Sequence, residues 1–242
     1  MFKLLRNSLL SVISPQECQV CSRHVDNYED GVACGKCWSE TRIFDSHHVR
    51  CSKCGAYFND SGKVKDIRCH KCDEHSYDKA VAVAIYEKAM AATVISLKST
   101  PFIPVRVIKD LIGAFDRSGF GDTTMIMPIP LSRRRQLERG YNQAEVIATV
   151  LAKHTGIGMD SFSLARKLHS PIHRVAMDMK ARELTVKNAF EVTRPKLIKN
   201  QNILLIDDVF TSGSTSSYCA KVLKKNGAAS VNVLTLARAV MN

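Results

Sequence analysis

Four C-x-x-C pairs crowd into the first third of this 242-residue chain and constrain its fold more than any other feature. Twelve residues separate the first two pairs, and fourteen separate the last two. Each pair offers two thiolates from one tight turn, and a closed tetrahedral Zn²⁺ site takes two such pairs. The spacing therefore predicts two structural zinc sites with eight ligands: Cys18, Cys21, Cys34, Cys37, Cys51, Cys54, Cys69 and Cys72.

The pairing of these cysteines has two solutions. Sequential ribbons join the first pair with the second and the third with the fourth, whereas a cross-brace interleaves them. We favour sequential ribbons. Five nearby histidines are surplus to a complete set of eight thiolates: His24, His47, His48, His70 and His75. The segment holds few large apolar side chains, so we expect its folding to depend on the metal.

The first 14 residues carry Lys3 and Arg6 among leucines, but polar residues break the apolar run and no small-residue cleavage site follows. This pattern disfavours a signal peptide and predicts an amphipathic helix, packed on the protein or on a membrane surface. No apolar run reaches the roughly 18 residues that a membrane span needs. Clustered C-x-x-C pairs without a secretory signal indicate metal rather than disulfides, so we expect a cytoplasmic protein. The ninth cysteine, Cys219, is expected to be a small buried apolar residue.

The net charge of +12 is unevenly distributed along the chain. Residues 1–76 contain 11 Lys and Arg against 10 Asp and Glu, whereas residues 77–242 contain 24 against 13. Such a basic excess indicates a polyanionic partner, either nucleic acid or a phosphorylated substrate. Because the Cys-rich segment is nearly neutral, we favour a structural or docking role for its zinc sites over a grip on nucleic acid.

From Tyr77 onward the hydrophobic pattern alternates between strand and helix. Strands are predicted over 80–86, 124–127, 202–206 and 230–236, and helices over 89–97, 105–115, 141–153 and 214–225. This alternation predicts an α/β fold: a parallel sheet with helices on both faces, preceded by the small zinc-ribbon module. The chain thus divides into an amphipathic segment (1–15), a double zinc ribbon (16–76) and an α/β domain (77–242).

An acidic pair follows the most apolar predicted strand. Asp207 and Asp208 come directly after it, and a small loop with hydroxyls and a glycine then opens a helix. Such a loop at a helix N-terminus binds anions, and ligands of open α/β sheets lie at the carboxyl ends of strands. Two carboxylates suit ribose hydroxyls or a divalent cation instead. The stretch therefore predicts a sugar-phosphate site that includes Thr211, Ser212, Gly213, Ser214 and Thr215.

A second unusual stretch, between a proline-terminated strand and a helix, carries four arginines within seven residues: Arg133, Arg134, Arg135 and Arg139. Guanidinium groups bind phosphates bidentately, and we expect a flexible loop that brings several of them to one polyanion. The ring of Tyr141 offers a surface on which a base could stack. A solvated basic loop is the alternative interpretation.

The stretch 203–215 resembles the phosphoribosyl diphosphate (PRPP) signature of type I phosphoribosyltransferases. Together with the C-x-x-C pairs and the segment Arg139-Gly140-Tyr141-Asn142-Gln143-Ala144, it makes the whole chain resemble the ComF family of bacterial competence proteins. The resemblance implies a phosphoribosyltransferase-like domain in which Asp207 and Asp208 hold the ribose 2′- and 3′-hydroxyls. Residues 211–215 would hold the 5′-phosphate, with Mg²⁺ accompanying PRPP. Lys98 falls where this fold has a diphosphate-binding loop.

The segment before the acidic pair also fits the family, with Arg182 and Ala189-Phe190 in place. It departs where relatives commonly have Gln and Asn, because His173 and Thr185 stand there instead. If those amides touch a base or a nucleic acid, specificity at that end differs in this chain.

Three functions are compatible with these features. The first is a competence protein that handles incoming single-stranded DNA, with residues 133–135, 139 and 141–143 as a nucleic-acid or diphosphate loop. The second is an active Mg–PRPP-dependent phosphoribosyltransferase whose acceptor and catalytic residues the sequence does not assign. The third is a PRPP-sensing adaptor whose ribbons dock a DNA-uptake motor or a recombination protein.

Overall fold

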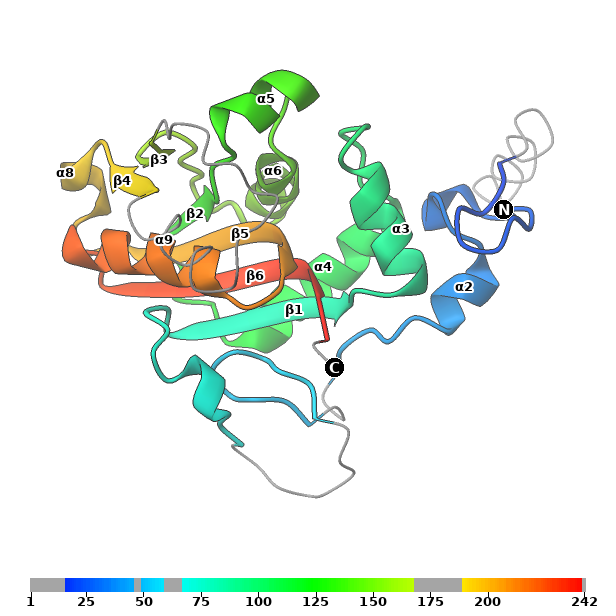
Figure 1. The fold of residues 1–242 in the computed structure, drawn as a ribbon, viewed down its shortest axis with the longest axis horizontal. Helices are drawn as coiled ribbons and strands as arrows, with labels where there is room; N and C mark the ends of the chain where they lie inside the picture. The colour runs from blue at the N-terminus through cyan, green and yellow to red at the C-terminus, as the bar shows by residue number, and fades with distance from the viewer. Residues whose placement is uncertain (1–15, 46–48, 59–66, 168–188, 241–242) are drawn as a thin grey trace, which may run out of the picture.

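The computed structural model describes residues 16–45, 49–58, 67–167 and 189–240 (Figure 1). The predicted N-terminal amphipathic segment lies outside the described residues, as do His173, Arg182 and Thr185. None of the described helices is long and apolar enough to cross a lipid bilayer.

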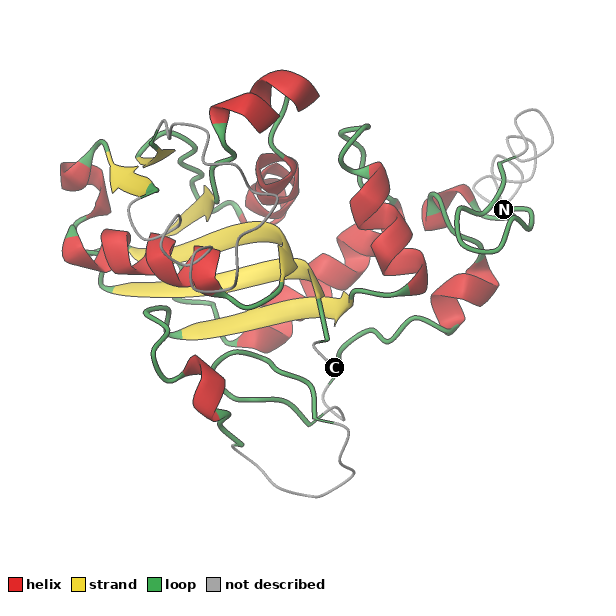
Figure 2. Cartoon of the chain, in the orientation of Figure 1, coloured by secondary structure: helices red, strands yellow, loops and turns green. Residues whose placement is uncertain are grey.

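A four-stranded parallel sheet forms the centre of the chain (Figure 2). Its strands are β1 (Lys79–Ile85), β2 (Met125–Pro128), β5 (Asn202–Phe210) and β6 (Ser230–Arg238), in the spatial order β1-β6-β5-β2. Ile206 of β5 pairs with Pro128 on one side and with Leu234 on the other. Because all three strand pairs are parallel, the carboxyl ends of the strands meet at one edge, where open α/β sheets bind ligands.

Helices cover both faces of this sheet. Three of them, α3 (Lys88–Ser96), α4 (Val105–Ser118) and α6 (Gln143–Thr155), pack on one face. The other face carries α9 (Ser214–Lys225), α8 (Pro195–Ile198) and an antiparallel hairpin of β3 (Leu164–Arg166) and β4 (Phe190–Val192). Shorter elements are α5 (Arg133–Arg139), α2 (Gly35–Ser39) and the 3-10 turns η1 (Tyr28–Asp30) and η2 (His70–Cys72).

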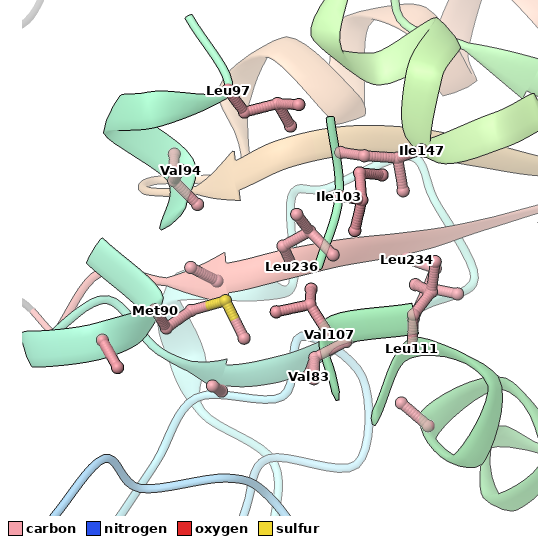
Figure 3. Close-up of a cluster of buried hydrophobic side chains, with 14 of the residues drawn as sticks. Val83, Met90, Val94, Leu97, Ile103, Val107, Leu111, Ile147, Leu234 and Leu236 are labelled. Carbon is pink, nitrogen blue, oxygen red and sulfur yellow. The ribbon is translucent and has the colours of Figure 1, made fainter. Parts of the chain in front are cut away.

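The alternation of side chains along β5 explains why the core has two sides, because successive residues of a strand point to opposite faces. Ile203 and Leu205 belong to the apolar cluster that includes α9, whereas Leu204 and Ile206 belong to the cluster that includes α3, α4 and α6. Figure 3 shows the second of these clusters from close by. Each fully buried aliphatic side chain stabilises the fold by roughly 1.5–3 kcal/mol. The α/β fold class predicted from the sequence is confirmed.

One predicted strand is longer than expected. The apolar pattern predicted a strand that stops before the acidic pair, but β5 continues to Phe210 and includes both carboxylates. The continuation is possible because β6 is equally long and pairs Asp207 with Thr235 and Phe210 with Arg238. The acidic pair is therefore held by the sheet itself.

The flexible arginine loop predicted from the sequence is wrong, because residues 133–139 form helix α5. Ser132 caps its first turn by accepting a hydrogen bond from the backbone N–H of Arg135. Gly140 ends the helix in the left-handed conformation (φ 74°) and donates its N–H to the carbonyl oxygen of Gln136. A serine before a helix and a glycine after it are ordinary helix boundaries, and the helix between them sets the backbone positions of the four arginines.

Candidate functional site

The eight N-terminal cysteines form two clusters of four, and the pairing is sequential. The Sγ–Sγ distances are 3.7 Å for Cys18–Cys37, 3.6 Å for Cys21–Cys34 and Cys51–Cys72, and 3.4 Å for Cys54–Cys69. Four sulfurs at the Zn–S distance of about 2.3 Å in a tetrahedron lie about 3.8 Å apart, so the clusters fit Zn²⁺. Within the described residues, neither cluster includes a histidine.

Hydrogen bonds from backbone N–H groups lower the pKa of one thiol in each cluster. Burial raises the pKa of the Cys18 thiol, but backbone donors, first the N–H of Cys34 at 3.2 Å, bring it down to about 6. The pKa of Cys51 is likewise raised by burial and then lowered to about 6 by the N–H groups of Cys54 and Cys69. Thiolate is the form that binds zinc, so these hydrogen bonds favour metal binding.

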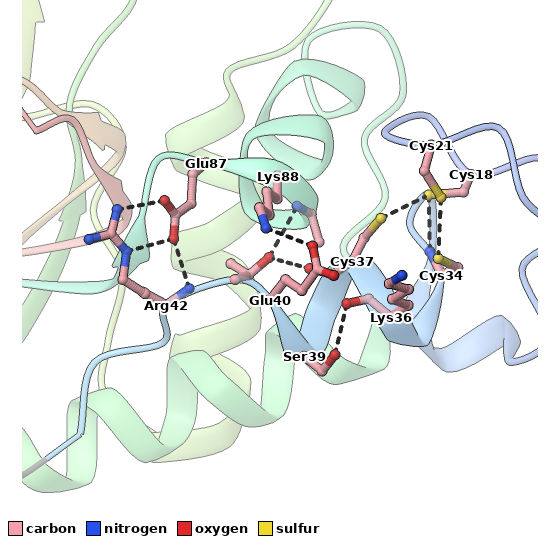
Figure 4. A network of polar contacts seen from close by, with 12 residues as sticks. Cys18, Cys21, Cys34, Lys36, Cys37, Ser39, Glu40, Arg42, Glu87 and Lys88 are labelled. Atoms are coloured by element: carbon pink, nitrogen blue, oxygen red, sulfur yellow. Dashed lines mark hydrogen bonds and ion pairs between the residues drawn. The ribbon is translucent and has the colours of Figure 1, made fainter.

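The first ribbon (residues 16–45) packs against α3 and α4 (Figure 4). Trp38 is buried, and its Nε1 donates to the carbonyl oxygen of Asp30 at 2.9 Å. Arg106 of α4 lies 5.0 Å from the centre of the Trp38 ring and 3.2 Å from the Asp30 carboxylate. Arg42 makes two hydrogen bonds of 2.9 and 2.7 Å to the carboxylate of Glu87, just before α3.

The second ribbon (residues 49–58 and 67–76) packs instead against the apolar core on the face of the sheet that carries α9. The backbone N–H of Ala80 in β1 donates to the carbonyl oxygen of Lys53 at 2.7 Å. Arg238, the last residue of β6, donates to the carbonyl oxygen of Cys54 and lies 4.6 Å from the centre of the Phe210 ring. One side chain therefore joins a metal ligand to the residue that ends β5.

The chain that leaves the second ribbon continues this contact. The ring of His75 stacks on Tyr77 at 5.1 Å, and Tyr77 meets Phe210 edge-on at 5.8 Å. The backbone N–H of Ser76 donates to Ser217 Oγ of α9 at 3.0 Å. The second ribbon thus lies directly beneath the turn between β5 and α9.

A cavity of about 440 Å³ opens at the carboxyl edge of the sheet. It brings together predicted residues that lie more than 100 positions apart: Lys98, Arg135, Arg139, Asn142, Gln143, Asp207, Asp208, Thr211 and Thr215. Its lining does not include six other predicted residues: Arg133, Arg134, Tyr141, Ser212, Gly213 and Ser214. The cavity is thus lined both by the two carboxylates of β5 and by cationic side chains.

The acidic pair is held by its own backbone. Asp208 donates its N–H to Asp207 Oδ1 at 2.9 Å, and Val209 donates its N–H to Asp208 Oδ1 at 2.7 Å. Burial and the neighbouring Asp208 carboxylate raise the pKa of Asp207 well above its ordinary value, and Arg135 offsets part of this effect. A partner that carries hydroxyl donors or a divalent cation would relieve the repulsion between the two carboxylates.

The turn from β5 to α9 needs a glycine at its tightest point. Gly213 has φ 81°, and a Cβ there would lie 2.5 Å from the Phe210 ring. Ser212 Oγ and Ser214 Oγ are hydrogen-bonded to each other at 2.9 Å. Thr215, in the first turn of the 12-residue helix α9, lines the cavity, so the positive end of the helix dipole is directed there.

Two of the four arginines of α5 line the cavity and two do not. Arg139 lines it and donates from Nη1 to Gln143 Oε1 at 2.8 Å. Arg134, in contrast, pairs with Glu138 at 2.6 Å, and its side chain is 87% exposed. Sequence reasoning missed Arg166 of β3, which also lines the cavity, because no motif surrounds it.

The three predicted residues that follow Gly140 have structural contacts of their own. Tyr141 donates its hydroxyl to the carbonyl oxygen of Leu97 at 2.8 Å, which fixes α6 next to Lys98. Asn142 is buried and caps α6 by accepting the N–H of Ala144 at 3.1 Å. Gln143 is only 2% exposed and lines the cavity, where its Nε2 has no partner among the described residues. An unpaired buried amide of this kind is a donor for a ligand oxygen.

Comparison with known sequences gives the context of this site. Residues 9–74 match the family model of the double zinc ribbon domain. The chain is 27% identical to Competence protein F of Haemophilus influenzae over 229 residues, which is 92% of this chain and 90% of that protein. It is 33% identical to Competence protein ComFC of Bacillus subtilis over 119 residues, 47% of this chain and 44% of that protein. DNA utilization protein YhgH of Salmonella typhimurium is 27% identical and covers 78% of this chain and 83% of its own length.

The solved structures that align with this chain have low sequence identity to it and low TM-scores. The allosteric regulatory enzyme of purine biosynthesis aligns with 57% of this chain at 17% identity and a TM-score of 0.38, and the aligned region is 28% of that enzyme. A purine phosphoribosyltransferase from Pyrococcus horikoshii aligns with 55% of this chain and 70% of its own length at 15% identity and a TM-score of 0.30. The resemblance to the ComF family predicted from the sequence is confirmed by the curated relatives and the double zinc ribbon.

Proposed function

Because this chain is a homologue of Competence protein F and of ComFC, we propose that it handles incoming single-stranded DNA in the cytoplasm during natural transformation. Its cavity at the carboxyl edge of the sheet binds PRPP or a similar sugar phosphate. The observation that carries the proposal is the mixed lining of this cavity, which brings the carboxylates of Asp207 and Asp208 together with the cations Lys98, Arg135 and Arg139.

The lining matches the chemistry of a phosphorylated ribose. Carboxylates accept hydrogen bonds from ribose hydroxyls, and the first turn of α9 with Thr211 and Thr215 suits a terminal phosphate. Lys98 and the two arginines suit a diphosphate group. Asp207 and Asp208 would hold a Mg²⁺ ion, since paired carboxylates suit this cation, and the ion would neutralise charge on the diphosphate.

The DNA part of the proposal rests on charge. The 24 Lys and Arg against 13 Asp and Glu in residues 77–242 favour a polyanion, and α5 places Arg135 and Arg139 at the cavity. A single strand would therefore approach the cavity along α5, with a phosphate near these arginines.

Fluorescence anisotropy of labelled single-stranded DNA, with and without Mg–PRPP, tests this part. We expect log–log salt plots with a slope of about −0.7 for each neutralised phosphate. Arg135→Gln with Arg139→Gln should weaken binding at least tenfold, and PRPP should displace the DNA. Arg134→Gln is the matched control, because Arg134 belongs to the same helix but pairs with Glu138 outside the cavity. Equal losses in the two variants, or no binding near physiological salt, would contradict the DNA role.

Calorimetry with Mg–PRPP tests the sugar-phosphate site. Asp207→Asn should abolish binding and yet raise the stability of the ligand-free protein. The raised pKa of Asp207 means that its ionisation opposes folding, so wild-type stability should increase as pH falls through that pKa, and the variant should lose this dependence. The exposed Asp116 offers the control Asp116→Asn. A lowered melting temperature in Asp207→Asn would assign the carboxylate a structural role.

Phosphoribosyl transfer is the second candidate function, favoured by the cations that line the cavity together with the acidic pair. In that reaction the bond between C1′ of the ribose and the diphosphate oxygen breaks, and a bond from C1′ to an acceptor nitrogen forms. Lys98, Arg135 and Arg139 would stabilise the departing diphosphate. Diphosphate release should then appear with one member of a panel of acceptor bases, and silence across the panel would reject it.

A third candidate function is a PRPP-sensing adaptor. The first ribbon keeps exposed side chains on α2, such as Lys36 and Ser39, available for a DNA-uptake motor or a recombination protein. A pull-down that depends on the eight cysteines and not on Asp207 would favour this function over the other two.

A further inference from the structure

A second cavity, of about 270 Å³, shares no lining residue with the sugar-phosphate cavity. The ribbon, the first half of β1 and the last turn of α4 enclose it. Lys79, the first residue of β1, contributes to its wall. The acidic pair is at the opposite, carboxyl edge of the sheet, and a seven-residue strand spans roughly 20 Å. The two cavities therefore have separate linings.

Three cations from three different segments converge on this second cavity: Arg50, Lys79 and Arg117. None of the described lining residues is Asp or Glu. Each cation donates to a neutral backbone carbonyl oxygen rather than to a carboxylate. Arg50 donates to Asp45 at 3.1 Å, Lys79 to Ser118 at 2.8 Å and Arg117 to Phe44 at 3.3 Å. We refer to this space as the basic cavity.

The charges of the three cations are only partly balanced by the residues that line the basic cavity. Cys51, a ligand of the second zinc cluster, is the one described lining residue with an anionic form, and Asp45, whose carbonyl oxygen accepts from Arg50, does not line the cavity. Asp110 acts on Arg117 only from outside the cavity lining. Two guanidinium groups held near each other in a partly buried space cost free energy unless an anion joins them.

The C-terminal end of α4 accounts for part of this arrangement. Cations near the last turn of a helix stabilise its free carbonyl groups, and Lys79 does so at Ser118. Arg50 instead comes from the ribbon, donates to the carbonyl oxygen of Asp45 and lies over the Phe44 ring at 5.2 Å. The helix end therefore accounts for Lys79 and for Arg117, which lies in the last turn of α4, and leaves Arg50 of the ribbon beside them.

We propose that the basic cavity binds a phosphate group, carried either by a small phosphorylated molecule or by the backbone of a nucleic acid. Guanidinium forks suit phosphate oxygens, and a space of about 270 Å³ holds a phosphate with part of a sugar but not a drug-sized molecule. The site is independent of the sugar-phosphate cavity and of the function proposed for it.

The test uses a full-length double variant that carries both Arg50→Met and Arg117→Met. This variant is compared with wild type and with Lys153→Met. Methionine keeps the apolar stem that packs on Phe44, and Lys153 is an exposed cation on α6 that lines neither cavity. Calorimetry with inorganic diphosphate should give two classes of site in wild type and in the control. The double variant should lose the class of site that belongs to the basic cavity and keep the class that belongs to the sugar-phosphate cavity. Arg135→Gln with Arg139→Gln should instead weaken binding at the sugar-phosphate cavity.

Anisotropy with a single-stranded oligonucleotide identifies the source of the phosphate. A tenfold loss for diphosphate with unchanged oligonucleotide binding would assign the cavity to a small molecule, and losses for both would assign it to nucleic acid. Two zinc ions per chain and an unchanged circular dichroism spectrum would show that the variant is folded. If it is not folded, Lys79→Met replaces it. Unchanged diphosphate stoichiometry in a folded variant would overturn the proposal and leave the cations as supports for α4.

Discussion

The two zinc ribbons use the same ligand chemistry, yet they are attached to the α/β domain in different ways. The first packs on α3 and α4 and is joined there by ion pairs whose members are partly exposed, such as Arg42 and Glu87 at 45% and 23%. The second packs under the turn between β5 and α9, where Arg238 connects Cys54 to Phe210, the last residue of β5. The position of each zinc site in the fold, rather than its ligand motif, determines which part of the α/β domain the metal supports.

The largest difference between the ribbons should follow the loss of one metal ligand in each. Cys21→Ser and Cys54→Ser should each release about one zinc ion per chain, because three thiolates hold Zn²⁺ far more weakly than four. We expect Cys54→Ser to reduce the affinity for Mg–PRPP at least tenfold, since the support under Phe210 is lost. Cys21→Ser should leave this affinity within about twofold of wild type.

Zinc content by mass spectrometry and affinity by calorimetry check this comparison. Cys219→Ser is a control for the loss of a thiol as such, because Cys219 is buried in α9 and belongs to neither cluster. Equal affinity losses in the two zinc variants would mean that both ribbons support the cavity and would remove the distinction between them.

A smaller effect should come from the turn above the second ribbon. Gly213→Ala places a methyl group in the left-handed region at φ 81° and 2.5 Å from the Phe210 ring. Gly156→Ala has almost the same φ, 73°, but its methyl group would meet no atom within 4 Å. The shared backbone cost is about 1–2 kcal/mol, and overpacking should add roughly 1–3 kcal/mol at Gly213 alone. Urea unfolding measures both, and equal losses would show that Phe210 yields freely to the methyl group.

What the sequence predicted well is local. Each zinc cluster comes from two C-x-x-C pairs within about 20 residues, and the acidic pair is followed within seven residues by the glycine and hydroxyls of its turn. Such short spacings leave few geometries, so the residue types alone identify the chemistry. Helix α5 could also have been found this way, because Ser132 and Gly140 are its boundary residues.

What the sequence did not predict depends on contacts between distant segments. Arg238 touches Cys54 across 184 positions, and Arg166 reaches the cavity from a hairpin that no motif marks. Tyr141 was predicted to offer a ring for base stacking, and the hydrogen bond from its hydroxyl to the carbonyl oxygen of Leu97, 44 positions earlier, is a contact that no motif marks. Packing of the sheet and its helices, rather than spacing along the chain, decides which of these side chains meet.

The smallest effect should separate the two arginines that attach the ribbons. Arg238→Met removes hydrogen bonds to the carbonyl oxygen and Sγ of Cys54 and the contact with the Phe210 ring, all of them partly buried. We expect it to lower the free energy of unfolding by about 1–2 kcal/mol and to weaken Mg–PRPP binding a few-fold. Arg42→Met removes the partly exposed pair with Glu87 and should cost only about 0.2–1 kcal/mol, with binding unchanged. Urea unfolding and calorimetry on the same samples provide the comparison. If Arg238→Met lowers stability without changing affinity, the second ribbon stabilises the domain but does not position the turn. If Arg42→Met also weakens binding, the first ribbon acts on the cavity through α3, the helix that precedes Lys98.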